Sequence, residues 1–284
     1  MESRNRNVLI AVVVVLAMAV ICCCMLLLAA LLLGGISVGS TDWGGATSLY
    51  QERTEYTFAA GETPTLEIDN ATGPVVVRAG EGTDIQVVAI KRALRKSDVD
   101  RNNVDVKPLN GGVVLRAWQD RGVRGASVSL EISAPGDTIV EVHNGTGTID
   151  VSGFRRGASL RNGTGDLTVV DVLGQIRADV GTGSIVVRGA AGPVSMDTGT
   201  GSLRYDGVPQ GACRFDTGTG SIWLAVPKDL HAEVDLSVGT GSVESDFAVD
   251  GQVTKQSVRG TIGRGDECTI QADTGTGSIH LSLR

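Results

Sequence analysis

Aromatic side chains are scarce in this sequence. Phe, Trp and Tyr make up 4% of its 284 residues, whereas glycine occurs 39 times. Aromatic residues usually contribute much of the core of a globular domain. Their scarcity, together with the abundance of glycine, favours thin and repetitive β-structure with small core residues.

The sequence also has no surplus of positive charge. It contains 25 basic and 32 acidic residues, which gives a net charge of −7, and it shows no basic patch with interleaved aromatic residues. Proteins that bind nucleic acids usually present such a patch. Nucleic acid is therefore excluded from the expected partners.

Catalytic patterns are missing as well. The three histidines, His143, His231 and His280, are not spaced from serine and aspartate in a way that suggests a triad. No Gly-x-Ser-x-Gly elbow follows a strand and opens a helix. We expect a protein that is not an enzyme, with no catalytic residue, no metal ligand and no cofactor.

What the sequence does contain is one repeated phrase: Asn, Thr or Val, then Gly-Thr-Gly, a small polar residue and an aliphatic residue. The steps between successive copies are 18, 18, 18, 19, 21 and 36 residues. A constant period of this kind predicts stacked structural units. The copies begin at Asn144, Asn162, Val180, Thr198, Thr217, Val238 and Thr274.

Apolar residues alternate with polar ones on both sides of each phrase, as at Val140 and Val142 before the first copy and Ile149 and Val151 after it. Alternation around a glycine turn is typical of strand, turn and strand. We therefore predict an all-β fold, a β-solenoid with coils of about 18 residues. Coils would stack about 4.8 Å apart, so that like residues form columns.

Before the repeats, residues 8–33 form a run without any charge. As a helix it would be about 39 Å long, which is enough to span a bilayer. Arg4 and Arg6 precede it, so the positive-inside rule places the N-terminus in the cytoplasm. A cleaved signal peptide is the alternative, although its apolar region is usually about 7–15 residues long. Lipidation at Cys22 is a weaker alternative, because Ile21 rather than a small residue precedes it.

The expected organisation follows from these features. It comprises a cytoplasmic tail (1–7), one transmembrane helix (8–33), a flexible linker (34–55) and a β-solenoid domain (56–284).

The first part of the domain is less regular. Residues 66–77 match the repeat offsets as an eighth, degenerate copy, and a β-hairpin is predicted around residues 110–112. This irregular β-section would cap the solenoid and protect its edge. Its basic cluster at residues 91–101 is read as a solvated edge, with contact to a headgroup or polyanion as the alternative. In the last step, residues 246–266 are expected to form a loop excursion or an irregular coil.

Two cysteines lie in the domain, Cys213 and Cys268. Both fall at inward positions of their strands. If the coils stack in sequence order, these cysteines are two or three coils apart, beyond the reach of a disulfide. We expect two buried free thiols.

Three columns could carry a function or support the fold. The first lies two residues before each initial glycine and includes Asp179, Asp197 and Asp216, a candidate surface strip that is either a solvated acidic row or a weak site for a cation or basic ligand. The second is the central threonine of each Gly-Thr-Gly. It either binds ordered water, as an ice-binding surface would, or hydrogen-bonds the backbone of a neighbouring coil. The third is the Asn or Thr that opens each phrase, which we predict to be a buried hydrogen-bonding ladder.

Two further sequence patterns resemble functional motifs, but we interpret neither of them as a functional site. A calcium β-roll also has about 18 residues per coil, but it needs repeated turn carboxylates, and here only Asp166 follows a Gly-Thr-Gly. Asn70, Asn144 and Asn162 lie in Asn-x-Thr sequons, which we interpret as a coincidence of the repeat.

The anchored N-terminus, the repeated Thr-Gly-Thr-Gly-Ser-Ile phrase, the step at residues 226–230 and the closing Gly-Thr-Ile-Gly-Arg-Gly segment together resemble the bacterial putative-adhesin family. This family is a domain of unknown function, also described as a toast-rack-like β-solenoid. The resemblance covers residues 56–284. It implies a non-enzymatic solenoid outside the cytoplasm, often joined to membrane segments, and it implies no functional residues.

The expected function is a membrane-anchored, extracytoplasmic, adhesin-like binding module. Such a protein would sit in the cell membrane with a single pass and bind an unknown surface polymer or protein. The alternative is an envelope-stress sensing component that relays membrane-active agents to a membrane partner, since relatives in the family accompany such systems.

Overall fold

The computed structural model describes residues 49–109 and 111–284. The expected cytoplasmic tail (1–7), the transmembrane helix (8–33) and most of the linker lie outside these residues. In the described part of the chain, no helix has the length and apolar character needed to cross a bilayer.

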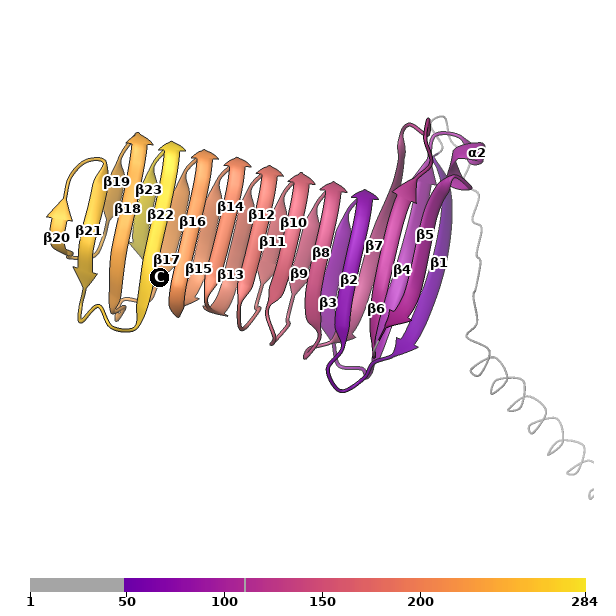
Figure 1. The fold of residues 1–284 in the computed structure, drawn as a ribbon, viewed down its shortest axis with the longest axis horizontal. Helices are drawn as coiled ribbons and strands as arrows, with labels where there is room; N and C mark the ends of the chain where they lie inside the picture. Colours follow the sequence, from indigo (N-terminus) through magenta and orange to yellow (C-terminus); the bar gives the residue numbers. More distant parts are fainter. Residues whose placement is uncertain (1–48, 110) are drawn as a thin grey trace, which may run out of the picture. The chain divides into compact units, whose positions relative to one another are not determined.

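The described residues form two β-sheets that face each other (Figure 1). Sheet A has 11 strands in the order β1 (Tyr50–Ala59), β4 (Asp84–Ala93), β7 (Ala126–Pro135), β3 (Val75–Gly80), β9 (Ile149–Ser152), β11 (Leu167–Val170), β13 (Ile185–Gly192), β15 (Leu203–Pro209), β17 (Ile222–Val226), β23 (Ile279–Leu283) and β19 (Val243–Ser245).

Sheet B has 12 strands in the order β20 (Asp250–Val253), β21 (Ser257–Ile262), β18 (Ala232–Thr240), β22 (Cys268–Thr276), β16 (Gly211–Thr219), β14 (Val194–Thr200), β12 (Ile176–Thr182), β10 (Ala158–Thr164), β8 (Ile139–Thr146), β2 (Thr65–Thr72), β6 (Gly112–Gln119) and β5 (Asn102–Leu109). One helical turn, α2 (Lys96–Val99), connects β4 to β5.

Each repeat forms one rung, which is a strand of sheet B, a Gly-Thr-Gly turn and a strand of sheet A. Neighbouring rungs pair in parallel and in register, so that Leu160 lies between Val142 and Ala178 and Leu167 lies between Ile149 and Ile185. The predicted all-β solenoid is thereby confirmed. The degenerate copy is confirmed too, because Asn70 pairs with Asn144 in the adjacent rung.

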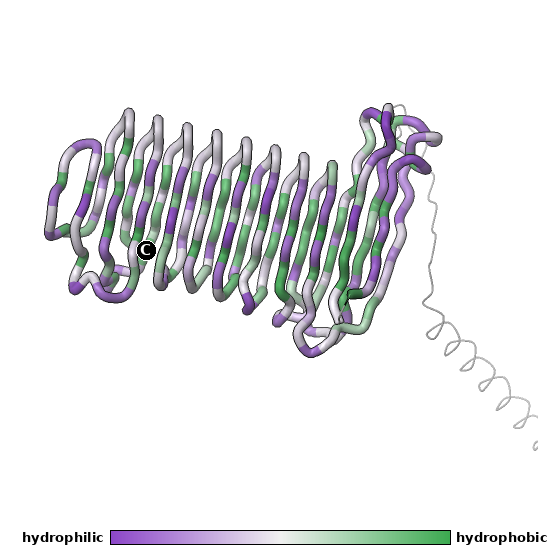
Figure 2. The backbone as a smooth tube through the Cα atoms, in the orientation of Figure 1, coloured by the Kyte–Doolittle hydropathy of each residue, from purple (hydrophilic) through white to green (hydrophobic). Residues whose placement is uncertain are grey.

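Apolar residues of both sheets are buried between them, and Figure 2 shows how hydrophobic and hydrophilic residues alternate along the strands. The core is built mainly from Val, Ile, Leu and Ala. Its largest buried side chains are Tyr205, Phe215 and Phe154, and the rings of Tyr205 and Phe215 lie 5.3 Å apart. The sheets can therefore lie close together along their length, as the scarcity of aromatic residues indicated.

The last position of each Gly-Thr-Gly turn requires glycine for two reasons, its positive φ and the close approach of the neighbouring rung. Gly201 has a φ of 150°, and a Cβ atom there would lie 1.9 Å from the carbonyl oxygen of Gly183. Only glycine allows the turns to stack at this separation.

The N-terminal section caps the solenoid as predicted. Strands β4 and β7 pair antiparallel, and β7 then pairs in parallel with β3 of the first rung. Strands β5 and β6 form the predicted hairpin, and β6 pairs in parallel with β2. The first strand begins at Tyr50, inside the expected linker, because β1 is an exposed edge strand without a clear apolar alternation before Tyr56.

The C-terminal part differs from the prediction. Residues 246–266 form neither a loop excursion nor an irregular coil. They contain the hairpin β20–β21, which pairs antiparallel with β18 at the end of sheet B. The last rung in the sequence, β22–β23, then returns and inserts between the rung of β16–β17 and the rung of β18–β19. The final step of 36 residues is therefore a crossover, and β23 lies inside the stack, between β17 and β19.

Because of this insertion, the expected separation of the cysteines by two or three coils is wrong. Cys213 and Cys268 lie on adjacent strands, because Cys213 pairs with Ile270 and Gly211 pairs with Cys268. Diagonal neighbours in a sheet are about 7–8 Å apart, which exceeds the usual Cα separation in a disulfide. Both cysteines are buried and free, as predicted.

Candidate binding surface

The candidate strip lies on the outer face of sheet B, in a column that crosses the sheet. Asp179, Asp197 and Asp216 are direct partners on β12, β14 and β16. Because β22 is inserted next to β16, Asp216 also pairs with Asp273. We call these four residues the aspartate run.

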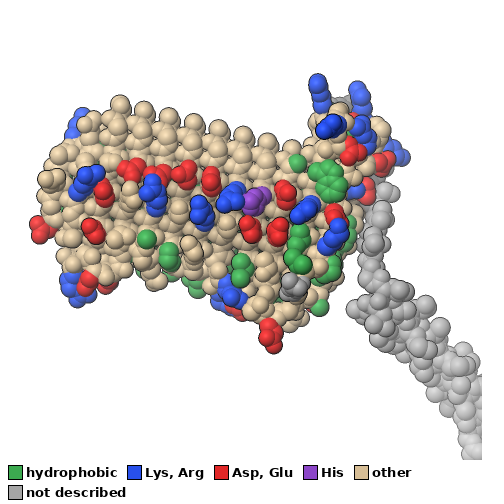
Figure 3. Space-filling view, in the orientation of Figure 1, with side chains coloured by type: hydrophobic (Ala, Val, Ile, Leu, Met, Phe, Trp, Pro, Cys, Tyr) green, Lys and Arg blue, Asp and Glu red, His purple; other side chains and the backbone are tan. Residues whose placement is uncertain are grey.

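Asp273 was not expected from the sequence to be a neighbour of Asp216. In sequence order Ser237 separates it from Asp216, and nothing in the repeat phrase reveals that the rungs are stacked in a different order. The complete column is Asp105, Arg116, Asp69, His143, Arg161, Asp179, Asp197, Asp216, Asp273, Ser237 and Ser257. Acidic and basic residues alternate at its start, whereas the aspartate run is acidic throughout (Figure 3).

The run is only partly neutralised by its neighbours. Arg214 forms an ion pair with Asp216 at 2.5 Å, and Asp273 accepts hydrogen bonds from Ser237 and from Gln271. Asp179 and Asp197 have no salt bridge among the described residues. Partial burial raises the pKa of Asp197, and the charges of Asp179 and Asp216 raise it further, against the opposing effect of Arg214 and Arg177.

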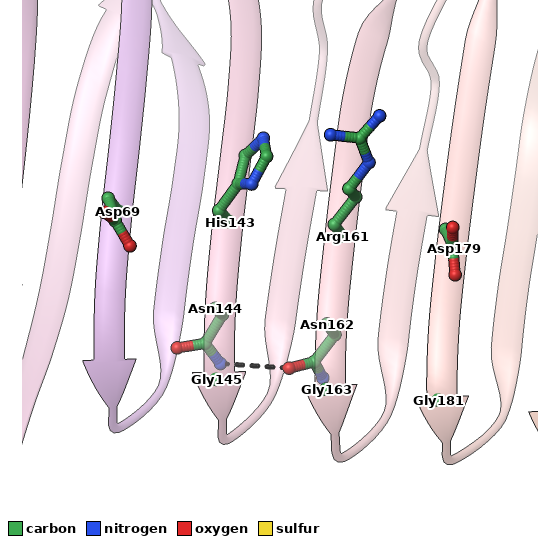
Figure 4. Close-up of a pocket in the computed structure, with 9 residues that line it drawn as sticks. All are labelled: Asp69, His143, Asn144, Gly145, Arg161, Asn162, Gly163, Asp179 and Gly181. Atoms are coloured by element: carbon green, nitrogen blue, oxygen red, sulfur yellow. Dashed lines mark hydrogen bonds between the residues drawn. The ribbon is translucent and has the colours of Figure 1, made fainter.

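A shallow groove runs beside this column because the first glycine of each phrase also points outward and has no side chain. Over the aspartate run, the groove is lined by Asp197, Asp216 and Asp273 together with Gly199, Gly218 and Gly275. A second stretch is lined by Asp69, His143, Arg161 and Asp179 (Figure 4). The arrangement offers an extended chain a track of charged groups at the spacing of the strands, about 4.8 Å.

Behind the groove, the Asn and Thr column forms the predicted ladder. The amide groups of Asn144 and Asn162 lie 3.3 Å apart (Figure 4), and the hydroxyl groups of Thr198, Thr217 and Thr274 donate to turn carbonyls of the preceding rungs. Asn70, Asn144 and Asn162 are buried. Their burial agrees with the interpretation of the sequons as coincidental.

Val180 interrupts the ladder, but the turn carbonyl beside it, that of Gly165, still accepts a hydrogen bond. Asn162 donates from Nδ2 to the carbonyl oxygens of Gly147 at 2.7 Å and Gly165 at 2.8 Å. By the pattern of the later rungs, the carbonyl of Gly165 is the one that a threonine at position 180 would contact. Because an asparagine has two amide hydrogens, it serves two rungs, and the next position can be apolar.

The central threonines form one continuous column at the turns. Its members are Thr72, Thr146, Thr164, Thr182, Thr200, Thr219, Thr276 and Thr240. In the repeats that begin at Asn144 and later, these threonines are exposed. Their hydroxyl groups make no hydrogen bond to a neighbouring coil within residues 49–109 and 111–284, so the second alternative, a hydrogen bond to the backbone of that coil, is wrong. The inward Asn and Thr ladder satisfies the turn carbonyls instead.

The basic cluster of the cap is engaged in local contacts. Lys91 pairs with Glu52, Arg92 donates to Ser129, and Arg101 lies 4.0 Å from Asp98. These contacts agree with the expected solvated edge.

On the opposite face, sheet A carries a column that the sequence did not reveal. The guanidinium of Arg204 lies 5.5 Å from the Trp223 ring centroid, and the rings of Trp223 and His280 stack at 6.0 Å. His280 in turn contacts Glu244 at 3.1 Å. Both faces of the indole are covered, so this column is a packed cluster and offers no free aromatic platform. It exists because β23 lies between β17 and β19.

Comparisons with known proteins give the following results. No family model and no curated protein matches this chain. Among solved structures, the chain is similar to a putative cell adhesion protein from Clostridium sporogenes, with 11% identity over 82% of this chain and 100% of that one and a TM-score of 0.35. It is also similar to a putative adhesin from Bacteroides fragilis, with 12% identity over 80% of this chain and 96% of that one and a TM-score of 0.39. A putative adhesin from Parabacteroides distasonis shows 10% identity over 80% and 96% of the two chains and a TM-score of 0.33.

Proposed function

We propose that this protein is a non-enzymatic, adhesin-like binding module that is anchored in the cell membrane by residues 8–33 and displayed outside the cytoplasm. The observation that carries the binding role is the aspartate run beside the glycine-floored groove. Its shape suits an extended polymer or protein segment, because the groove is long and shallow. Its charge suits a ligand with basic groups.

Binding should depend on Asp179 and Asp197, which have neither a salt bridge nor a side-chain hydrogen bond among the described residues. A full-length variant with Asp179→Asn and Asp197→Asn is compared with the wild type in a pull-down with whole cells, peptidoglycan and isolated surface polymers. We expect retention to fall about fivefold, since each opposite-charge contact contributes roughly 0.5 kcal/mol. Added salt should weaken wild-type binding as well.

The matched control carries Glu131→Gln and Asp150→Asn on the outer face of sheet A, where both residues flank Val76. It removes the same charge and should bind like the wild type. Equal retention of all three proteins would count against the aspartate run. Failure of the wild type to bind any of these materials would count against the binding module itself.

The aspartate run also favours the second candidate, an envelope-stress sensing component. Many membrane-active peptides are amphipathic and rich in Lys and Arg, so they would be attracted to this surface. A labelled cationic amphipathic peptide should bind the full chain, and a membrane-embedded partner should co-purify after gentle detergent extraction. If no partner is recovered, the sensing role is not supported.

A further inference from the structure

Strand β1 forms the outer edge of sheet A at the capped end of the solenoid (Figure 1). Along one side, all ten of its residues pair with β4. Within the described part of the chain, no strand pairs with its other side. Ten residues of unpaired strand present a row of N–H and C=O groups about 34 Å long.

The other sheet edges in the described residues are protected against further pairing. At the same end, β5 carries Pro108, which has no N–H to donate, next to Lys107. At the opposite end, β20 has four residues and contains Gly251, while β19 has three residues and its Val243 N–H donates to Lys255. Strand β1 has neither a proline nor a glycine.

The sequence of β1 is complementary to itself when a second copy runs in the opposite direction. If two such strands pair around Thr54, Arg53 of each copy lies opposite Glu55 of the other, and Glu52 lies opposite Tyr56. Tyr50 lies opposite Phe58. A shift of the centre to position 53 or 55 would instead place two arginines or two glutamates face to face, which is unfavourable. Charge therefore selects the register centred on Thr54.

The single protomer already shows that these charged groups can reach each other. Arg53 and Glu55 form an ion pair at 2.9 Å on the exposed side of the strand. In a pair of antiparallel strands, the two arginines and two glutamates would form one cluster with alternating charges. On the inner side, Tyr56 and Phe58 are only partly buried at the end of the core and stack at 6.4 Å. A second copy would cover them.

We propose that this chain forms a two-fold symmetric dimer in which the β1 strands of two copies pair antiparallel around Thr54. Sheet A of one copy then continues into sheet A of the other.

The test uses the full chain in detergent, with its mass measured by light scattering over a range of concentrations. We expect the wild type to dimerise. Arg53→Glu should weaken the dimer at least about tenfold, because two attractive pairs become repulsive, and Glu55→Arg should act in the same way. The double variant R53E/E55R restores opposite charges across the pair and should recover dimerisation. Arg78→Glu, an equal charge change at an exposed position within sheet A, is the matched control and should dimerise like the wild type.

The register is tested separately by oxidation. Thr54→Cys places two cysteines opposite each other and should give a disulfide-linked dimer, whereas Thr57→Cys faces Gln51 and should not. Thermal unfolding of each variant verifies that it is folded. A monomeric wild type would overturn the proposal. So would an oligomer that is indifferent to R53E, because association would then run through another surface, such as the apolar run at residues 8–33.

Discussion

Asp197 lies between Asp179 and Asp216, and each of the three carries a charge that the others repel. Partial burial and these two neighbours raise the pKa of Asp197 above its ordinary value of 3.8. The ionised form is thus less stable in the folded chain than in the unfolded chain. Folding is weakened above the raised pKa, and this penalty disappears as the pH falls below 3.8.

Replacing Asp197 by Asn should therefore stabilise the protein at pH 7, by only about 0.5 kcal/mol, because the carboxyl group is only partly buried and water screens much of the repulsion. The gain should vanish near roughly pH 3, where the wild-type carboxyl is protonated as well. Urea unfolding at both pH values measures it, with Asp150→Asn as the control. A destabilised variant at pH 7 would show that the run is not under repulsion.

The buried ladder can be tested at Thr217, whose hydroxyl donates to the carbonyl of Gly201 at 2.9 Å. Thr217→Val keeps the shape of the side chain and leaves this carbonyl unpaired. We expect a loss of about 1 kcal/mol in the free energy of unfolding. Val180 shows that valine fits this column sterically. The exposed neighbour Thr219→Val, which lies in the outer threonine column, should change stability by less than about 0.5 kcal/mol.

At the scale of single elements, the Gly-Thr-Gly turn is the part that tolerates least change. Gly201→Ala puts a methyl group 1.9 Å from the carbonyl oxygen of Gly183, and its φ of 150° is unfavourable for alanine. We expect a loss of at least about 2 kcal/mol or failure to fold. Gly82→Ala, where a Cβ atom meets nothing closer than 3.9 Å, is the control and should be nearly neutral. Thermal unfolding distinguishes the two variants.

Strand β23 provides a second test, because its position inside the stack contradicts the order of the sequence. Leu281 is fully buried, although only three residues of this sequence follow it. Leu281→Ala should cost about 2–5 kcal/mol, as in the middle of a core. Leu283, on the same strand, is 51% exposed, and Leu283→Ala should cost less than about 0.5 kcal/mol. Equal small losses in both variants would mean that the last strand is frayed and not inserted.

At the scale of the whole molecule, the solenoid behaves as a stack in which each rung is covered by its neighbours on both sides. The inserted rung β22–β23 joins the rung of β16–β17 to the rung of β18–β19. A loss of this rung would leave the rungs of β16–β17 and β18–β19 without their shared partner. The stability of the C-terminal third therefore depends on the contacts that β22 and β23 make on both sides.

The reactivity of the two buried cysteines, Cys213 and Cys268, tests whether the stack opens in the native protein. Burial raises the pKa of Cys213 and raises the pKa of Cys268 to about 11, so very little reactive thiolate is present at neutral pH. We expect no alkylation of either residue in the folded protein at pH 8 and full alkylation in denaturant, measured on the individual peptides by mass spectrometry. Rapid labelling of Cys268 in the native protein would show that the inserted rung opens.

The sequence by itself determined the structure of a single rung. Period, alternation and glycine turns predicted the two strands, the inward and outward positions, the Asn and Thr ladder and the neighbours Asp179, Asp197 and Asp216. These features are local, because the backbone conformation of glycine and the alternation of a strand depend on adjacent residues. Only the tertiary structure decided the order in which the rungs stack. Every rung presents nearly the same columns to its neighbours, so the repeat pattern does not reveal the order of the rungs. For this reason the fourth aspartate of the run, the adjacent cysteines and the cluster around Trp223 became visible only in the folded chain.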